Sequence, residues 1–191
     1  MPAGRKAIPD MATAKRTRQR DDTIEENHIG IDRQDAELLV RALNDDLANA
    51  IVLSHQVRKH HWVVEGAESL ELHRFLEDAY ETLESGADAI AERIHALGGV
   101  PVSGPSNLET RAAIDHEGES IYDARSMLEN DMEDYETLLT EVRSHVEMVE
   151  DLGDYGTAEL LREYLLAVEQ DAHHVQQYLE DDTLVLERAT R

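Results

Sequence analysis

The chain has no cysteine, only three lysines among its 18 basic residues, and a single tryptophan and a single phenylalanine in 191 residues. The absence of cysteine excludes disulfides and thiolate metal sites, and it leaves peroxide no thiol to oxidise. No apolar run comes near the roughly 18 residues of a membrane helix. The first twenty residues also lack an apolar stretch like that of a signal peptide. We therefore expect a soluble, cytoplasmic protein without a membrane partner.

Acidic residues dominate the charge, since 42 Asp and Glu oppose 18 Lys and Arg and give a formal net charge of -24. Charge of one sign keeps a protein soluble but makes its compact state repel itself. Concentrated salt screens that repulsion. The composition thus favours a halophile with a salt-rich cytosol, and an acidic protein from a mesophile is the alternative.

Apolar residues beyond position 31 recur at alternating steps of three and four, which is the period of packed helices. This pattern predicts an all-α fold with long helices at 33–63, 69–97, 121–152 and 155–180. Two turns are short and the central connection is long, as in a four-helix bundle with one crossover. In that connector, the sequence SNLE at 106–109 fits a capping box and predicts a short helix.

The chain divides into three predicted segments: a flexible N-terminal tail at 1–30, the helix bundle at 31–182 and a C-terminal tail at 183–191. The first thirty residues show no helical period. Six of the first twenty residues are basic, and Asp10 is the only acidic residue in the same stretch.

A group of polar residues lies on one face of the predicted helix 69–97. On a helical wheel with His73 at zero, Glu77 falls at about 40°, Asp88 at about 60° and Glu92 at about 100°. The apolar stripe of the same helix falls at about 240° to 300°. It consists of Leu72, Leu76, Ala79, Leu83, Ile90, Ile94 and Leu97. The polar face therefore points away from the core of its own bundle.

This orientation bears on where a metal site can be. A di-iron site inside a four-helix bundle takes an inward-facing Glu-x-x-His motif from each of two helices. Only Glu92-x-x-His95 occurs on a predicted helix, and it lies on the outward face. The sequence therefore disfavours a site inside the bundle.

The outward residues form two pairs, His73 with Glu77 and Asp88 with Glu92, and each pair is spaced so that it can bind one ion. The midpoints of the pairs are about 22 Å apart along the helix, so one ion cannot touch both pairs of the same chain. A two-fold axis near the middle of the helix would place each pair beside the other pair of a partner chain. His61, before the short turn, could reach the first pair.

The other histidines have plainer interpretations. In so acidic a chain, any single residue of the polar face is more often solvated than a ligand. At most one of two adjacent histidines can face a given site, so an iron route through helix 155–180 would use only one. Surface or packing positions are expected for His55 and His60, with His60 having the alternative of supporting the site beside His61. Surface positions are expected for His116 and His145. For His173 and His174 we expect structural or surface positions, with a secondary metal site or an iron route as the alternative.

The stretches HHWVVEGAESLELHRFLEDAY and DAIAERIHALGGVP, with the helix pattern around them, resemble the Dps family of ferritin-like proteins, and especially its acidic haloarchaeal members called DpsA. The shared motif is His-x11-His-x3-acid-x10-Asp-x3-Glu. Many members have Asp at the position of Glu77. The Glu77 side chain is longer than that of Asp, but it still offers a carboxylate oxygen as a ligand. The resemblance implies that Trp62 lies near the metal. It carries the family's intersubunit ferroxidase ligands, as catalytic and metal-binding residues, onto His61, His73, Glu77, Asp88 and Glu92.

The resemblance implies an iron-storage and detoxification protein that protects against oxidative stress. Such a protein is a hollow homo-dodecamer that oxidises Fe(II), preferably with hydrogen peroxide, and stores ferric mineral inside. Iron (Fe2+/Fe3+) is the implied metal, and imidazole with carboxylate suits it, although zinc accepts the same ligands.

DNA binding is the alternative function, because some members of the family bind DNA through a basic tail. The basic N-terminal residues, repeated twelvefold by assembly, would add avidity. The acidic body repels phosphate, and salt weakens phosphate binding steeply. Iron oxidation and storage is therefore the favoured interpretation.

Overall fold

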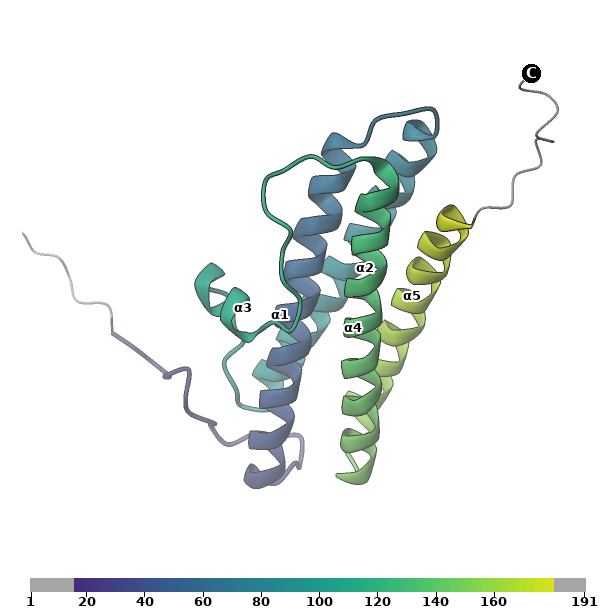
Figure 1. Ribbon diagram of the computed structural model, residues 1–191. Helices are drawn as coiled ribbons and strands as arrows, with labels where there is room; N and C mark the ends of the chain where they lie inside the picture. The colour runs from purple at the N-terminus through teal and green to yellow at the C-terminus, as the bar shows by residue number, and fades with distance from the viewer. Residues whose placement is uncertain (1–15, 181–191) are drawn as a thin grey trace, which may run out of the picture.

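A computed structural model of the chain describes residues 16–180 (Figure 1). Within that range there is no strand, and the helices are α1 (Arg33–Val63), α2 (Ser69–Ala96), α3 (Pro105–Arg111), α4 (Ala124–Asp151) and α5 (Tyr155–Leu179). The all-α prediction is confirmed, including the short helix in the long connector. The largest difference in a long helix is the start of α4, at 124 instead of 121.

The four long helices form a closed ring in which α1 packs against α2 and α4, and α5 packs against α4 and α2. All seven apolar residues predicted for the α2 stripe are buried: Leu72, Leu76, Ala79, Leu83, Ile90, Ile94 and Leu97. The outward direction of the α2 polar face follows from this burial. The short helix α3 lies outside the ring beside α1 (Figure 1). None of the helices in residues 16–180 is long and apolar enough to cross a bilayer.

The start of α3 differs from the prediction. Its N-cap is Gly104, which makes no side-chain capping bond, and Pro105 occupies the first helical turn. Ser106 lies inside the helix, where its carbonyl accepts a 2.7 Å hydrogen bond from the Thr110 hydroxyl. The predicted capping box is therefore wrong, because proline is favourable at the first helical position and moves the helix start ahead of the serine.

The described part of the predicted N-terminal tail runs against the bundle. The Glu25 amide donates a 2.9 Å hydrogen bond to the Gly98 carbonyl, and the Gln19 side chain donates a 2.7 Å bond to the same oxygen. Ile24 and Ile31 pack against the core. Residues 16–31 are thus tied to the end of α2. The rest of this tail and the predicted C-terminal tail lie outside the described residues.

Replacing Gly98 by alanine will lower the free energy of unfolding more than the same change at Gly153. Both glycines follow a helix end with positive φ, +86° and +75°, so both changes bring the strain of a left-handed alanine, about 1–2 kcal/mol. Only at Gly98 would the new methyl group collide with a backbone oxygen, that of Glu25. Urea denaturation of both variants checks this, and equal losses would show that the N-terminal segment does not restrict Gly98.

Candidate metal centre at the α1–α2 turn

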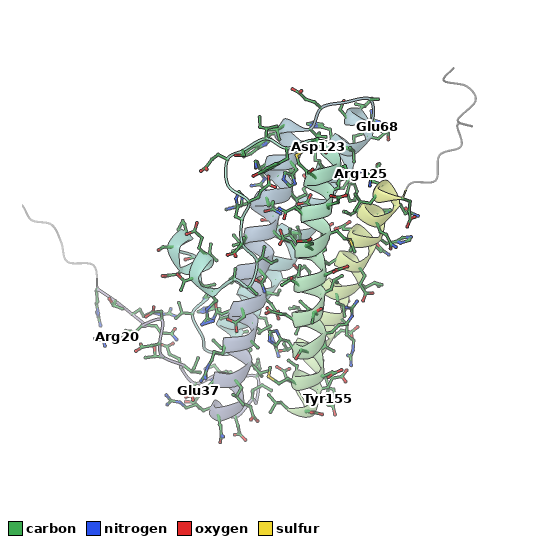
Figure 2. The ribbon with its side chains drawn as sticks, viewed as in Figure 1. Arg20, Glu37, Glu68, Asp123, Arg125 and Tyr155 are labelled. Carbon is green, nitrogen blue, oxygen red and sulfur yellow. The ribbon has the colours of Figure 1, made fainter. Side chains whose placement is uncertain are left out.

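The predicted site residues lie at one end of α1 and along the outward face of α2. His61 is in the last turn of α1 and is partly buried, whereas His73, Glu77, Asp88 and Glu92 are exposed. The α1–α2 turn and the start of α4 lie at the same end of the bundle, as the labels of Glu68 and Asp123 show (Figure 2). The turn reverses the chain within five residues, so the end of α1 meets the start of α2.

The rings of His61 and His73 are stacked, with their centroids 3.8 Å apart and their planes 20° from parallel. Each ring bonds the backbone of the other residue: His61 Nδ1 to the His73 carbonyl at 2.9 Å, and His73 Nδ1 to the His61 carbonyl at 2.8 Å. Helix ends leave carbonyls without a helical partner, which explains why the His61 oxygen is available.

This reciprocal bonding sets the tautomer of both rings. A carbonyl oxygen only accepts, so each Nδ1 carries a proton and donates it. In a neutral imidazole the other nitrogen then keeps its lone pair. Both histidines therefore have Nε2 free to bind a metal, and the hydrogen bond at Nδ1 is the kind of support that orients metal-binding histidines.

The two pairs of predicted ligands on α2 lie far apart along the helix axis. Glu77 follows His73 by one helical turn, whereas Asp88 and Glu92 lie about 22 Å farther along the axis, measured between the midpoints of the two pairs. Within residues 16–180 of a single chain, no group of three or more His, Asp or Glu side chains is placed to hold a metal ion. One chain therefore brings His61 and His73 together but leaves Asp88 and Glu92 apart from them.

Aromatic and basic side chains border the histidine pair. Tyr80 lies edge-on to the His61 ring, with centroids 5.5 Å apart. The guanidinium of Arg58 lies 4.5 Å over the Tyr80 ring and pairs with Glu84. Trp62, next to His61 in the sequence, is 69% exposed.

His60, expected on the surface or in packing, is fully buried in a polar network. Its Nδ1 lies 2.9 Å from an Asp131 carboxylate oxygen of α4, and its Nε2 lies 2.7 Å from Glu117 of the connector. Burial lowers the pKa of His60, but hydrogen bonds and the charges of Asp131 and Glu117 outweigh it, so the pKa rises above 6.5. A signal was present in the sequence, because Asp131 falls on the apolar stripe between Leu128 and Tyr135.

His145 is also not the surface residue that was predicted. Its Nδ1 lies 2.8 Å from Asp46 of α1, and the side chains are 19% and 0% exposed. The prediction failed because α1 packs against the side of α4 that carries His145. His55 and His116 are exposed as expected, and His173 and His174 are both exposed on α5.

The pair of His145 with Asp46 will make stability depend on pH. Burial lowers the pKa of His145, but the hydrogen bond to Asp46 and its charge raise it above 6.5, with further help from Glu141 and Asp45. A raised histidine pKa stabilises the fold below pH 6.5, and this contribution is lost as pH rises through the folded-state pKa. The stability difference between the wild type and His145→Gln should therefore shrink above pH 6.5, as measured by urea denaturation in a pH series. A constant difference would contradict the raised pKa.

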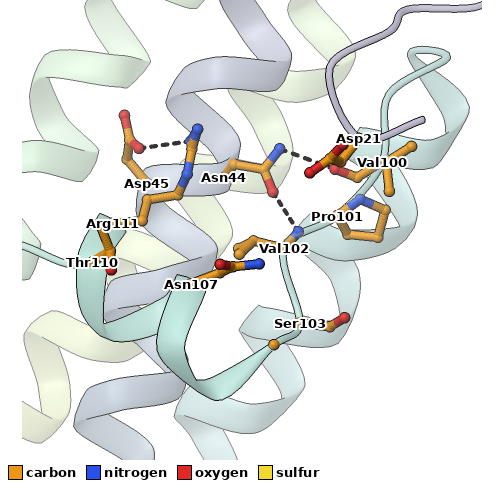
Figure 3. Close-up of a pocket in the computed structure, with 11 residues that line it drawn as sticks. Asp21, Asn44, Asp45, Val100, Pro101, Val102, Ser103, Asn107, Thr110 and Arg111 are labelled. Atoms are coloured by element: carbon orange, nitrogen blue, oxygen red, sulfur yellow. Dashed lines mark hydrogen bonds and ion pairs between the residues drawn. The ribbon is translucent and has the colours of Figure 1, made fainter.

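A separate groove of about 680 Å³ lies between α1, α3 and the N-terminal segment (Figure 3). Its polar side chains bond within the chain: Asp45 pairs with Arg111 at 2.9 Å, and Asn44 accepts from the Val102 amide at 2.7 Å. The groove contains none of the predicted ligands, and these bonds attach α3 and the connector to α1.

Comparisons with known proteins agree on one kind of fold. A family model described as a ferritin-like domain matches residues 40–185. The chain is 49% identical over 180 residues to the "DNA protection during starvation protein" of Halobacterium salinarum, covering 94% of this chain and 99% of that protein.

Solved structures give the same result. An archaeal Dps homologue from Halobacterium salinarum matches with a TM-score of 0.88 and 49% identity, covering 93% of this chain and 99% of the other. A Dps protein from Vibrio cholerae O1, described as a member of a broad superfamily of ferritin-like diiron-carboxylate proteins, matches with a TM-score of 0.77 and 32% identity. That match covers 83% of this chain and 99% of the other.

Proposed function

Because this chain belongs to the Dps family of ferritin-like proteins, we propose that it oxidises Fe(II) with hydrogen peroxide and stores the ferric product in a hollow dodecamer. Each site would combine His61, His73 and Glu77 of one chain with Asp88 and Glu92 of a two-fold partner. The function would be iron storage and protection against the oxidative damage that free Fe(II) and peroxide cause together.

The observation that carries this proposal is the stacked pair of His61 and His73. Two imidazoles are oriented with both Nε2 atoms free on an outward face, which suits a ligand and not a core residue. The same face carries a second, acidic half-site that its own chain cannot use. An isologous dimer interface would join the two kinds of half-site twice.

The ligand types fit the redox chemistry. Imidazole nitrogen suits Fe(II), and carboxylate oxygen suits both Fe(II) and the harder Fe(III) product. Two Fe(II) ions each lose one electron, the O–O bond of peroxide accepts both electrons and breaks, and the two oxygens leave as water after taking up protons. Because iron is the substrate, the site must release Fe(III), and exposed carboxylates that exchange with water permit this.

The proposal is tested by loading the iron-free protein anaerobically with Fe(II) and titrating with peroxide. Two Fe(II) should be oxidised per peroxide, and light scattering should show a particle of twelve chains that keeps its size as iron accumulates. Oxidation at the rate of Fe(II) in buffer alone would overturn the ferroxidase assignment. A monomer or dimer that does oxidise Fe(II) would overturn the storage assignment only.

DNA binding is the second candidate, supported by the name of a Synechococcus relative, "Nutrient stress-induced DNA-binding protein", and by the exposed residues Arg16, Arg18 and Arg20. The net charge of -24 opposes it, because phosphate contacts weaken with salt and cannot offset repulsion from the body. A gel shift at low and molar salt, with and without residues 1–22, tests the candidate. Retardation that needs these residues and survives molar salt would establish it.

A further inference from the structure

The interior of the bundle contains a buried polar network directly behind the candidate metal centre. Its centre is His60, whose side chain is 0% exposed and is bonded at both ring nitrogens. One partner, Asp131, is also 0% exposed, and the other, Glu117, is 8% exposed. Burying three ionisable groups is costly unless each is paired and hydrogen-bonded, so this arrangement tolerates little movement.

The two carboxylates are themselves held from several sides. Gln56 donates to Asp131 at 3.2 Å and to Asp134 at 2.5 Å, and it accepts from the Glu117 amide at 3.0 Å. Asn130 donates to Glu117 at 3.1 Å, and the ammonium of Lys59 pairs with the same carboxylate. The network thus joins three segments, α1, α4 and the connector.

The network bonds the last turn of α1, which also carries His61 of the candidate metal centre. Helix ends fray, and α1 ends at Val63, only three residues after His60. His60 points into the bundle, and the next residue, His61, stacks on His73 outside it. The last turn of α1 is therefore held from inside by α4 and the connector, and from outside by α2.

We infer that His60, with Asp131 and Glu117, is a positioning residue for the metal centre: it fixes the last turn of α1 so that His61 stays stacked on His73 with its Nε2 free. This role rests on the proposed function, because it assigns His60 to the support of that site. His60 does not touch the metal in this scheme and acts through the backbone it shares with His61. Loss of the network should weaken metal binding about 10- to 100-fold, as loss of supporting groups does in other metal sites.

The chain offers a matched control. His145 bonds Asp46 between the same two helices, α1 and α4, at 2.8 Å. Asp46 lies 15 residues before His61, which is about 22 Å along α1. His145→Leu therefore removes the same kind of buried histidine–aspartate contact far from the metal centre.

The test compares His60→Leu, His60→Gln and His145→Leu in the full-length protein by calorimetric titration with Zn(II) alone. His60→Leu should lose about 10-fold or more in Zn(II) affinity, and His60→Gln, which retains one donor for Asp131, should lose less. His145→Leu should bind Zn(II) like the wild type. In Fe(II) oxidation, the KM for Fe(II) of His60→Leu should rise more than kcat falls.

Wild-type Zn(II) affinity in His60→Leu, with only a lower melting temperature, would make the network purely structural and overturn this inference. Equal losses in His60→Leu and His145→Leu would do the same. If His60→Leu does not fold, the comparison of His60→Gln with His145→Leu decides in the same way. A wild-type protein that binds no Zn(II) and oxidises no Fe(II) would instead overturn the proposed function itself.

Discussion

Replacing His73 by alanine will slow peroxide-driven oxidation of Fe(II) by about 100-fold or more, the upper end of what loss of a mere supporting group costs. The substitution removes one proposed Nε2 ligand and also the Nδ1 bond to the His61 carbonyl, so the remaining imidazole loses its stacking partner. His73 is exposed on α2, so the fold and the particle size should be unchanged. Stopped-flow absorbance of ferric product measures the rate, and light scattering measures the particle.

His55→Ala is the control for this measurement. His55 is another exposed helical histidine, on α1, and it belongs to neither half of the proposed site. The His55→Ala variant should oxidise Fe(II) at the wild-type rate. If His73→Ala is as fast as His55→Ala, the stacked histidines are not the oxidation site.

Chains with His73→Ala and chains with Asp88→Asn, each nearly inactive alone, will recover about a quarter of the wild-type activity when equal amounts are assembled together. In the proposed dimer, each site would take its histidines from one chain and Asp88 from the partner. In a random mixture, half of the histidine half-sites and half of the acidic half-sites are intact, so about one site in four is complete. The mixture can be made by co-expression or by refolding the two variants together.

This experiment separates a shared site from a site within one chain. If each chain used its own Asp88, every chain in the mixture would carry one defect, and activity would stay at the level of the single variants. The matched control mixes His73→Ala with Glu77→Gln, since both residues belong to the same half-site. That mixture should recover nothing, because no combination of these chains completes a site.

Much of the fold could be predicted because its signal is local. The apolar stripe of α2 from Leu72 to Leu97 repeats with the helical period, and each of its residues is buried in the core. Burial of such a stripe requires only that other helices pack against it, as they do in any helix bundle. The outward direction of His73, Glu77, Asp88 and Glu92 follows from the same period, since residues on one helix have fixed relative angles. The Dps resemblance rested on this spacing.

The failures came from contacts across the fold. His145 was predicted at the surface, and its partial burial depends on Asp46 arriving from another helix. His60 was expected in packing or at the surface, and its bonds to Asp131 and Glu117 depend on residues from α4 and the connector. The start of α3 was misplaced because the capping pattern at Ser106 competed with the proline before it. The attachment of residues 16–31 depends on the Gly98 carbonyl, about seventy residues away in the chain.

The amino-acid sequence alone was thus sufficient for the all-α bundle, the approximate extent of its four long helices and the outward direction of the two polar pairs on α2, because helical geometry converts spacing directly into direction. The three-dimensional structure was needed for the stacking of His61 on His73, the free Nε2 atoms and the buried anchor of His60. These depend on how tightly α1, α2, α4 and the connector pack together. Spacing specifies which residues share a face, whereas distances of a few ångströms between helices are set by the packing of the whole core.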